Sequence, residues 1–204
     1  MLEIGLDRAT TSAVAECLGV DQSTLYRHID SREDMLDAAV AVAVGRTIWP
    51  DPEGNWADYL RACAKAMWGM FEASPGLAQR LRSMTTIPEE LVMQSYRIVD
   101  QLTQLGFSLK DAALIVDTIG DMTADSYLTV ELLDRVVGGG GSYRDRAIET
   151  MAHAGGIVPN QKTAAEYLGV MRYAMGERGK PSAWWMDKVD LVIDGVAYRL
   201  CERN

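Results

Sequence analysis

The sequence lacks the features of several large classes of protein. It has only three cysteines among 204 residues, Cys17, Cys63 and Cys201, and they are scattered without the CxxC spacing of a thiolate zinc site. An odd number of this kind argues against a disulfide framework, so we expect the three thiols to be reduced. No run of eighteen uncharged apolar residues occurs, which predicts no membrane span and no secretory signal. The sequence therefore predicts a cytoplasmic protein that does not associate with membranes.

Proline is scarce, and basic residues are fewer than acidic ones. The chain has 18 glycines and 6 prolines, with 48% hydrophobic and 24% charged residues, and this composition excludes collagen, a low-complexity linker and a disordered chain. Its length suits one large helical domain or a small module joined to a larger one. Twenty basic residues against 29 acidic ones give a formal net charge of −9. Any contact with nucleic acid must therefore come from a local surface that works against the overall charge.

Apolar residues recur at helical spacing along most of the chain. Trp56, Tyr59, Leu60, Cys63 and Met67, for example, fall at intervals of three and four on one face of a long helix. Glycine and proline separate such stretches, and we predict an all-α fold. The predicted helices cover about residues 10–18, 22–28, 31–46, 55–74, 88–105, 109–137, 162–177 and 182–202. Residues 138–160, which begin with four glycines, are predicted as an irregular connection.

The segment from Thr10 to Leu36 has the pattern of a helix-turn-helix unit. A short helix ends at Leu18, a turn follows at Gly19–Asp21, and a second short helix leads to a third that is capped by Ser31. The second helix carries side chains that can reach base edges or phosphates in a major groove, namely Gln22, Thr24, Tyr26, Arg27 and His28. A polar surface helix with no role in DNA binding is the alternative interpretation.

The same residues resemble the DNA-binding signature of the TetR family of transcriptional regulators. The match rests on Thr10-Thr11, Val14-Ala15, Leu18-Gly19-Val20 and Thr24 to His28, and it extends to Trp56 through Arg61 and Gly106 through Leu109. The resemblance implies an N-terminal DNA-binding domain at residues 1–46 and a helical ligand-binding and dimerisation domain at 47–204. The residues that it assigns to DNA binding are Thr11, Gln22, Ser23, Thr24, Tyr26, Arg27, His28 and Arg32.

Two departures from the family pattern change what the resemblance implies. The family's first helix occupies about fifteen residues before the position of Gly5, where this chain has only Met1 to Ile4, so this helix is nearly absent. Residues 1–46 carry four basic and eight acidic side chains, and we expect the chain as it stands to bind DNA weakly. The side chains that hold a magnesium-chelated tetracycline in the family are replaced by Ser83, Cys63 and Ile48, so no metal and no cofactor are expected.

The family's ligand cavity implies a candidate binding site between helices of the second domain. The residues assigned to it are Cys63, Met67, Phe71, Ile87, Val92, Tyr96, Asp117 and Asp121. Ordinary core packing is the alternative for the apolar members of this set. Asp117, Asp121 and Asp125 share one helical face and can form a solvated stripe, a polar cavity wall or, after burial, a general acid or base. The isolated His153 receives no role.

The last helix has apolar residues on two sides. One stripe contains Trp185, Val189, Val192, Val196 and Leu200, and the other contains Trp184, Leu191, Gly195 and Tyr198. One stripe can pack inward, and the other predicts a homodimer through the last helix and the 109–137 helix. A central helix that is buried within one subunit is the alternative explanation.

Two functions agree with these features. The first is a ligand-responsive repressor that binds operator DNA and is released or retuned by a small, mainly apolar effector. The alternative is a TetR-like dimer that has lost DNA binding and binds or transforms a hydrophobic metabolite, as a cyclase-type enzyme would. The sequence shows no GxSxG elbow, metal-ligand cluster or phosphate loop, and no catalytic residue is assigned.

Overall fold

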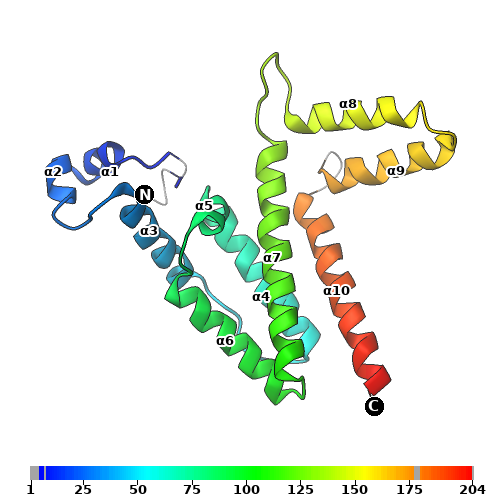
Figure 1. The fold of residues 1–204 in the computed structure, drawn as a ribbon, viewed down its shortest axis with the longest axis horizontal. Helices are drawn as coiled ribbons and strands as arrows, with labels where there is room; N and C mark the ends of the chain where they lie inside the picture. Colours follow the sequence, from blue (N-terminus) through cyan, green and yellow to red (C-terminus); the bar gives the residue numbers. More distant parts are fainter. Residues whose placement is uncertain (1–4, 7, 177–179, 204) are drawn as a thin grey trace. The chain divides into compact units, whose positions relative to one another are not determined.

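The structure, a computed structural model, describes residues 5, 6, 8–176 and 180–203. Within these residues the chain is all-α, as predicted, and the sole β feature is an isolated bridge between Val136 and Ser142. Figure 1 shows the helices in chain order. They are α1 (Thr11–Leu18), α2 (Gln22–Leu25), α3 (Arg32–Arg46), α4 (Trp56–Ala73), α5 (Leu77–Ser83), α6 (Glu89–Gln104), α7 (Leu109–Leu133), α8 (Tyr143–Gly155), α9 (Gln161–Ala174) and α10 (Pro181–Arg203).

The helices divide into two compact units at the middle of α7. The first unit comprises residues 1–124 and the second comprises residues 125–204. The predicted functional boundary after residue 46 falls inside the first unit, at the C-terminal end of α3, and stays a prediction. The prediction that the family's first helix is nearly absent concerns residues 1–4. These residues lie outside the described part of the chain.

Polar side chains start three helices of the first unit at the expected places. Thr10, Ser31 and Asn55 each accept a hydrogen bond from the backbone N–H three residues later, at Ala13, Asp34 and Asp58. Such N-caps satisfy backbone donors that have no partner inside the helix. The predicted beginnings of these helices, at about residues 10, 31 and 55, are thereby confirmed.

The second helix is shorter than predicted. It ends at Leu25 rather than at residue 28, because the next amides bond to carbonyls three residues back. The N–H of Arg27 donates to the Thr24 carbonyl and the N–H of His28 donates to the Leu25 carbonyl. These bonds tighten the chain into a turn. Tyr26, Arg27 and His28 therefore lie on a turn after α2 and not on the helix itself.

The core of the first unit joins the DNA-binding segment to the helices that follow. α3 packs against α5 and α6, and its apolar face buries Leu36, Val40 and Val44. Phe71 of α4 and Leu77 of α5 are fully buried in the same unit. The α5 helix was not predicted; it begins after Gly76, whose φ of 83° lies in the left-handed region.

Polar contacts add to this packing. Arg80 of α5 donates from Nε to the Asp37 carboxylate of α3 at 2.8 Å, forms a second, shorter bond to the same oxygen, and reaches the Glu33 carbonyl at 3.2 Å. α3 and α5 are therefore connected by an ion pair as well as by apolar contacts.

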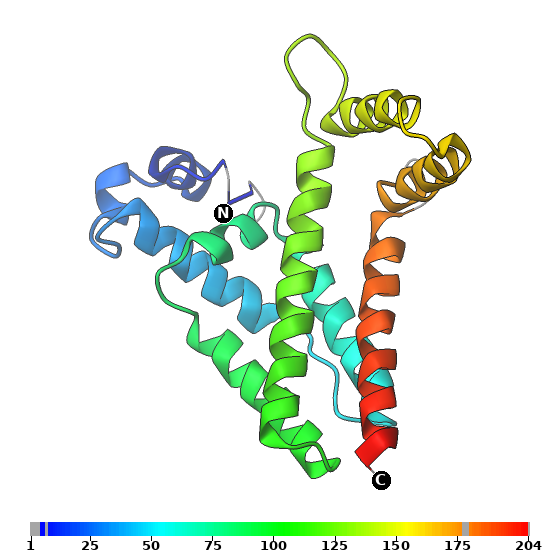
Figure 2. The same cartoon turned by 45° about the vertical axis from the view of Figure 1, so that its right-hand side comes forward.

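The second unit contains the end of α7, a helical hairpin and α10 (Figure 2). α7 ends at Leu133, four residues earlier than predicted, and α8 forms at residues 143–155, where an irregular connection was predicted. A capping box starts α8: Ser142 accepts from the Asp145 N–H, and the Asp145 carboxylate accepts from the Ser142 N–H. The Ser142 backbone N–H, followed by its hydroxyl, holds the pKa of Asp145 below its usual value.

The α8–α9 hairpin is held by close packing at its turn. A Cβ on Gly155 would lie 3.4 Å from the Ala164 Cβ of α9, so the two helices approach closely there. α9 packs on α10, where the rings of Tyr173 and Trp184 meet edge to face at 6.4 Å. At the start of α10, Lys188 donates to the Ser126 hydroxyl of α7 at 3.2 Å. No described helix is long and apolar enough to cross a bilayer.

Candidate functional site

α1 and α2 form the predicted helix-turn-helix pair. α1 ends at Gly19, whose φ of 66° allows its N–H to bond the carbonyls of Ala15 and Glu16. The Val20 N–H also donates to the Ala15 carbonyl, at 3.0 Å. This left-handed glycine reverses the chain within three residues and places α2 against α1. A side chain at position 19 would strain the turn.

Hydrogen bonds connect three of the predicted DNA-binding residues to the unit itself. The Gln22 amide donates to the Thr11 hydroxyl at 2.6 Å and accepts from the Ser12 hydroxyl at 3.3 Å. Arg32 donates from Nε to the Ala9 carbonyl at 3.0 Å. Gln22 thus joins α2 to α1, and Arg32 joins α3 to the segment before α1. Their contacts with DNA stay predictions.

The remaining predicted DNA-binding residues lie on or directly after α2. Ser23, Tyr26, Arg27 and His28 are exposed, and Thr24 is half-buried. A hydroxyl, a phenol, a guanidinium and an imidazole are thereby available for bases and phosphates. The local charge is unfavourable, because Asp21 and Asp30 flank this surface and are also exposed.

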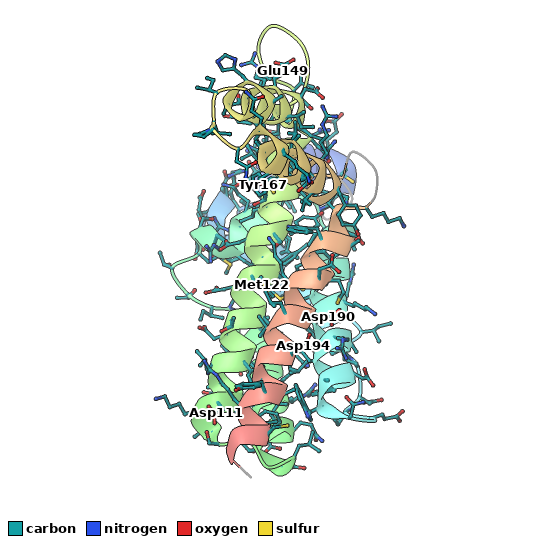
Figure 3. The ribbon with its side chains drawn as sticks, turned by 90° about the vertical axis from the view of Figure 1, so that its right-hand side faces the viewer. Asp111, Met122, Glu149, Tyr167, Asp190 and Asp194 are labelled. Carbon is teal, nitrogen blue, oxygen red and sulfur yellow. The ribbon has the colours of Figure 1, made fainter. Side chains whose placement is uncertain are left out.

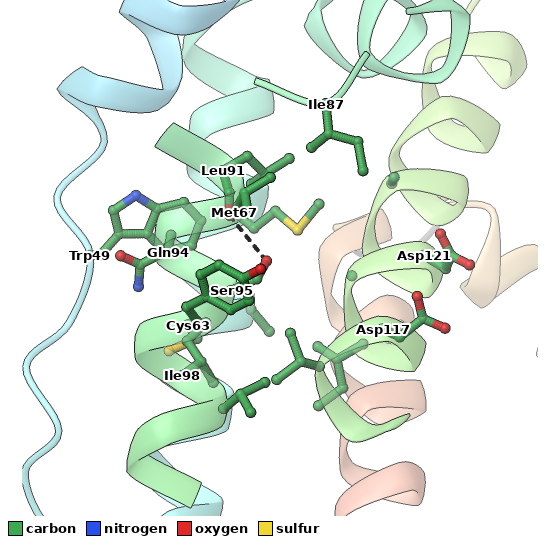
Figure 4. A pocket seen from close by; sticks show the side chains of 18 of the residues that line it. Trp49, Cys63, Met67, Ile87, Leu91, Gln94, Ser95, Ile98, Asp117 and Asp121 are labelled. Atoms are coloured by element: carbon green, nitrogen blue, oxygen red, sulfur yellow. Dashed lines mark hydrogen bonds between the residues drawn. The ribbon is translucent and has the colours of Figure 1, made fainter. Parts of the chain in front are cut away.

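A cavity of about 510 Å³ lies within the first unit, between α4, α5, α6, the first half of α7 and the segment after α3. Its volume is in the range of small-molecule sites, ~300–1,000 Å³. Most of its lining is apolar, and Figure 4 shows Met67, Ile87, Leu91 and Ile98 around it. The predicted ligand residues that line the cavity are Cys63, Met67, Ile87, Val92, Tyr96, Asp117 and Asp121. Phe71 was predicted to line the cavity but does not; its side chain packs in the core of the first unit instead and is fully buried.

The thiol of Cys63 is buried on the α4 side of the cavity. Burial raises its pKa to about 11, and the hydrogen bond with Tyr59 opposes this shift only in part. Burial is also the main cause that raises the pKa of Tyr59. Burial therefore favours the protonated forms of both groups and disfavours the thiolate of Cys63.

The two aspartates of α7 lie at the exposed edge of the cavity. Asp117 and Asp121 are both exposed, and Asp121 accepts a hydrogen bond from Arg82 of α5 at 3.4 Å. Exposure keeps both carboxylates in contact with water. Asp125, the third aspartate of the predicted stripe, belongs to the second unit and does not line the cavity.

The residues at the places of the family's metal anchors do not meet in the cavity. Ser83 is exposed and donates to the Arg80 carbonyl, and Ile48 is 91% exposed. Neither lines the cavity, whereas Cys63 does. Across the described part of the chain, no three His, Cys, Asp or Glu side chains form a group that could hold a metal ion.

The cavity also has lining residues that the sequence did not predict, and Trp49 and Gln94 are two of them. Trp49 lies in the segment between α3 and α4, and Gln94 lies on α6. Gln94 shares the buried stripe of α6 with Ile98 and Leu102, at intervals of four residues. A polar residue on an apolar stripe is the signal that could have identified it. Trp49 follows no periodic pattern that would assign it to a cavity.

The surface of α10 is apolar on one exposed side. Trp185, Val189 and Ile193 form its buried stripe, so Ile193 takes the place predicted for Val192. Leu191 is 74% exposed and Tyr198 is 66% exposed. Figure 3 shows the aspartates Asp190 and Asp194 one turn apart along the same helix. Of the second apolar stripe predicted for this helix, Leu191, Gly195 and Tyr198 are exposed, whereas Trp184 packs on Tyr173 of α9.

Comparison with known proteins agrees with this architecture. Residues 1–39 match the model of the family described as bacterial regulatory proteins, tetR family. The chain is 28% identical over 146 residues to the class D tetracycline repressor of Escherichia coli, and this match covers 65% of the chain and 64% of that repressor. It is 27% identical over 206 residues to the class A repressor from transposon 1721 in Escherichia coli. This alignment covers 99% of the chain and 88% of that repressor.

Solved structures share the fold. ActR from Streptomyces coelicolor in complex with actinorhodin, a TetR family protein, aligns with a TM-score of 0.70 at 18% identity, over 97% of this chain and 90% of that one. A single-substitution variant of TetR from Acinetobacter baumannii AYE in complex with minocycline aligns with a TM-score of 0.54 at 23% identity, over 63% of this chain and 73% of that one. These structural alignments show that the chain shares the fold of both proteins.

Proposed function

We propose that this chain, which belongs to the TetR family of bacterial regulatory proteins, is a ligand-responsive repressor that binds operator DNA as a homodimer. A small, mainly apolar effector occupies its cavity and changes its affinity for the operator. The observation that carries the proposal is that one compact unit contains both the helix-turn-helix pair and the apolar cavity. The similarity to regulatory proteins favours this function over the enzymatic alternative.

A physical connection between the two sites supports the response to a ligand. The cavity includes Leu81 and Arg82 of α5, and Arg80 of the same short helix holds Asp37 of α3. A ligand that moves α5 therefore acts on α3, which is in turn tied through Arg32 to the start of the helix-turn-helix. The ligand has an effect only if it binds the two arrangements of α3 with different affinity.

The uncovered face of α10 supports the dimer. Two copies that bring Leu191 and Tyr198 together bury apolar side chains that are exposed on a single chain. In the same unit, α7 exposes Leu132, and the proposed interface includes this helix. A two-fold dimer presents two copies of α2 to two half-sites of an operator.

The complexes of similar structures guide the choice of effector. One relative by fold was solved with actinorhodin and another with minocycline. We propose an effector of polycyclic character for this chain, in keeping with the apolar lining around Met67, Leu91 and Ile98.

Selection of bound sequences from a random DNA pool, followed by fluorescence-anisotropy titration at two salt concentrations, tests the proposal. We expect one sequence to bind at least about a hundredfold more tightly than the pool, and His28→Ala or Tyr26→Ala to remove most of this preference. Arg27→Ala should lower the salt slope by about 0.9 if it contacts one phosphate. Tyr167→Ala is the matched control, because Tyr167 is exposed on α9, outside the helix-turn-helix.

If no sequence is preferred over the pool at either salt concentration, the chain is not an operator-binding repressor. Binding of a ligand in the cavity would then favour the metabolite-binding alternative.

A further inference from the structure

Gln94 is a buried polar residue in the lining of the cavity. Only 5% of the residue is exposed, and it lies between the apolar side chains that α6 turns inward. No hydrogen bond of its side-chain amide is found among the described residues, and the amide atoms stay accessible from the cavity. Water can therefore meet the hydrogen-bonding needs of the amide when no ligand is bound. A polar group in the wall of an apolar, ligand-sized cavity is a position at which a ligand can form an orienting hydrogen bond.

Trp49 adds a flat apolar surface to the same cavity. It lies in the segment after α3, and Figure 4 shows it with Gln94 on the side of the cavity away from Asp117 and Asp121. Aromatic rings pack face to face or edge to face against other flat rings. Leu91 and Ile98, on the same helix as Gln94, also line the cavity. A flat ring system can therefore lie between apolar side chains with its edge at the amide.

The charges around the cavity favour an uncharged ligand. The charged residues in its lining are Arg82, Asp117 and Asp121, and the Arg82 guanidinium is paired with Asp121. The remaining negative charge disfavours an anion. The end that holds Gln94 offers an amide and apolar surface, which give a cation no counter-charge.

We propose that Gln94 is the residue that selects the effector, and that the effector is a flat, uncharged polycyclic molecule with a hydrogen-bond donor next to an acceptor on one edge. The Gln94 Nε2 donates to the ligand carbonyl, and the Gln94 Oε1 accepts from the adjacent N–H or O–H of the ligand. This inference rests on the proposed function in one respect, the assignment of the cavity as the effector site.

The test compares two matched probes that differ in a single donor. Phenanthridin-6(5H)-one is a flat three-ring lactam with N–H beside C=O, and its N-methyl derivative lacks the donor. We expect the lactam to bind wild-type protein about tenfold more tightly than the N-methyl compound, as measured by calorimetry, because methylation leaves the Gln94 oxygen unpaired. In Gln94→Leu the two probes should bind within about twofold of each other.

Control variants separate ligand recognition from a structural role. Ser95→Ala also alters a cavity residue, but the Ser95 hydroxyl already donates to the Leu91 carbonyl at 3.0 Å, so this variant should keep the lactam preference. Gln94→Leu should melt close to the wild-type temperature, since Leu is of similar size and continues the apolar stripe that Ile98 and Leu102 form on α6. If Gln94→Leu fails to fold, Gln94→Met gives the same comparison with a more adaptable side chain.

Equal affinity of the two probes for wild-type protein, or a preference that survives in Gln94→Leu, would overturn the assignment of Gln94. Failure of both probes to bind would overturn the ligand class. These results are independent of DNA binding. An operator bound specifically without the lactam preference removes this inference alone, whereas the lactam preference without specific DNA binding removes only the repressor function.

Discussion

The ion pair between Arg80 and Asp37 offers a quantitative test of how α5 is connected to α3. Arg80 makes two hydrogen bonds to one carboxylate oxygen of Asp37 and one to the Glu33 carbonyl. The side chain of Arg80 is 17% exposed and that of Asp37 is 39% exposed. Water therefore weakens the pair without eliminating it. α5 lines the cavity and α3 follows the helix-turn-helix, so this contact connects the proposed ligand site to the proposed DNA-binding site.

The expected size of the interaction follows from this partial burial. A hydrogen bond to a charged group contributes about 1.5–3 kcal/mol when shielded from water, and an exposed ion pair contributes about 0.2–1 kcal/mol. For a half-shielded pair we expect a coupling free energy of about 1.5 kcal/mol between Arg80 and Asp37. Arg80→Met should lower the free energy of unfolding by about 2 kcal/mol, because it also loses the bond to Glu33.

Urea unfolding of Arg80→Met, Asp37→Asn and the double variant measures this coupling. Protein concentration is held fixed, because the stability of a dimer depends on it. The Arg61–Asp58 pair within α4 serves as control: its atoms are 3.1 Å apart, but Asp58 is 65% exposed, so Arg61→Met should cost less than about 0.5 kcal/mol. A coupling below about 0.5 kcal/mol for Arg80 and Asp37 would refute the view that this pair connects the two helices.

Further predictions concern the thiol, the hairpin, the dimer and the ligand. Folding raises the pKa of Cys63 from 9.0 to about 11, so between these pH values the folded chain keeps a proton that the unfolded chain releases. The free energy of unfolding should therefore fall between pH 9 and 11. Urea titrations of Cys63→Ala should lack this part of the decline. Ser142→Ala removes the cap of α8 and should cost about 1 kcal/mol, detected as faster amide exchange across that helix. Leu191→Arg should convert the dimer into a monomer in light scattering, whereas Glu166→Arg on α9 should not, and a wild-type monomer at micromolar concentration would contradict the interface. Tetracycline with magnesium should give no calorimetric signal, since Ser83 does not line the cavity and Cys63 stays protonated.

Local signals predicted the helix-turn-helix well. The caps at Thr10 and Ser31 and the left-handed Gly19 depend on residues close in sequence, so the pattern fixes them. The length of α2 could not be predicted in this way, because residues after Leu25 have no strong preference against a helix and the turn depends on tertiary packing. α8 was not predicted because glycines flank it, although Ser142 followed three residues later by Asp145 is the sequence pattern of a capping box.

The cavity shows where sequence patterns stop being informative. Periodicity identifies the apolar face of α4 but does not tell whether a residue on that face meets another side chain or an empty space. Met67 lines the cavity, whereas Phe71, one turn later on the same helix, is fully buried. The hydrogen bonds of Gln22 to α1 could not be predicted from the sequence either, since they depend on how the two helices pack. Gln94 and Trp49 come together only through the tertiary fold.

Footprinting of the selected operator tests the central claim most directly. A two-fold dimer that inserts one α2 from each subunit into the major groove should protect two half-sites, with centres separated by one helical turn of about 10 base pairs or a multiple of it. The same protection should be lost in His28→Ala and kept in Tyr167→Ala. A single unpaired patch, or no protection above that of random DNA, would contradict the account of this chain as a dimeric operator-binding repressor.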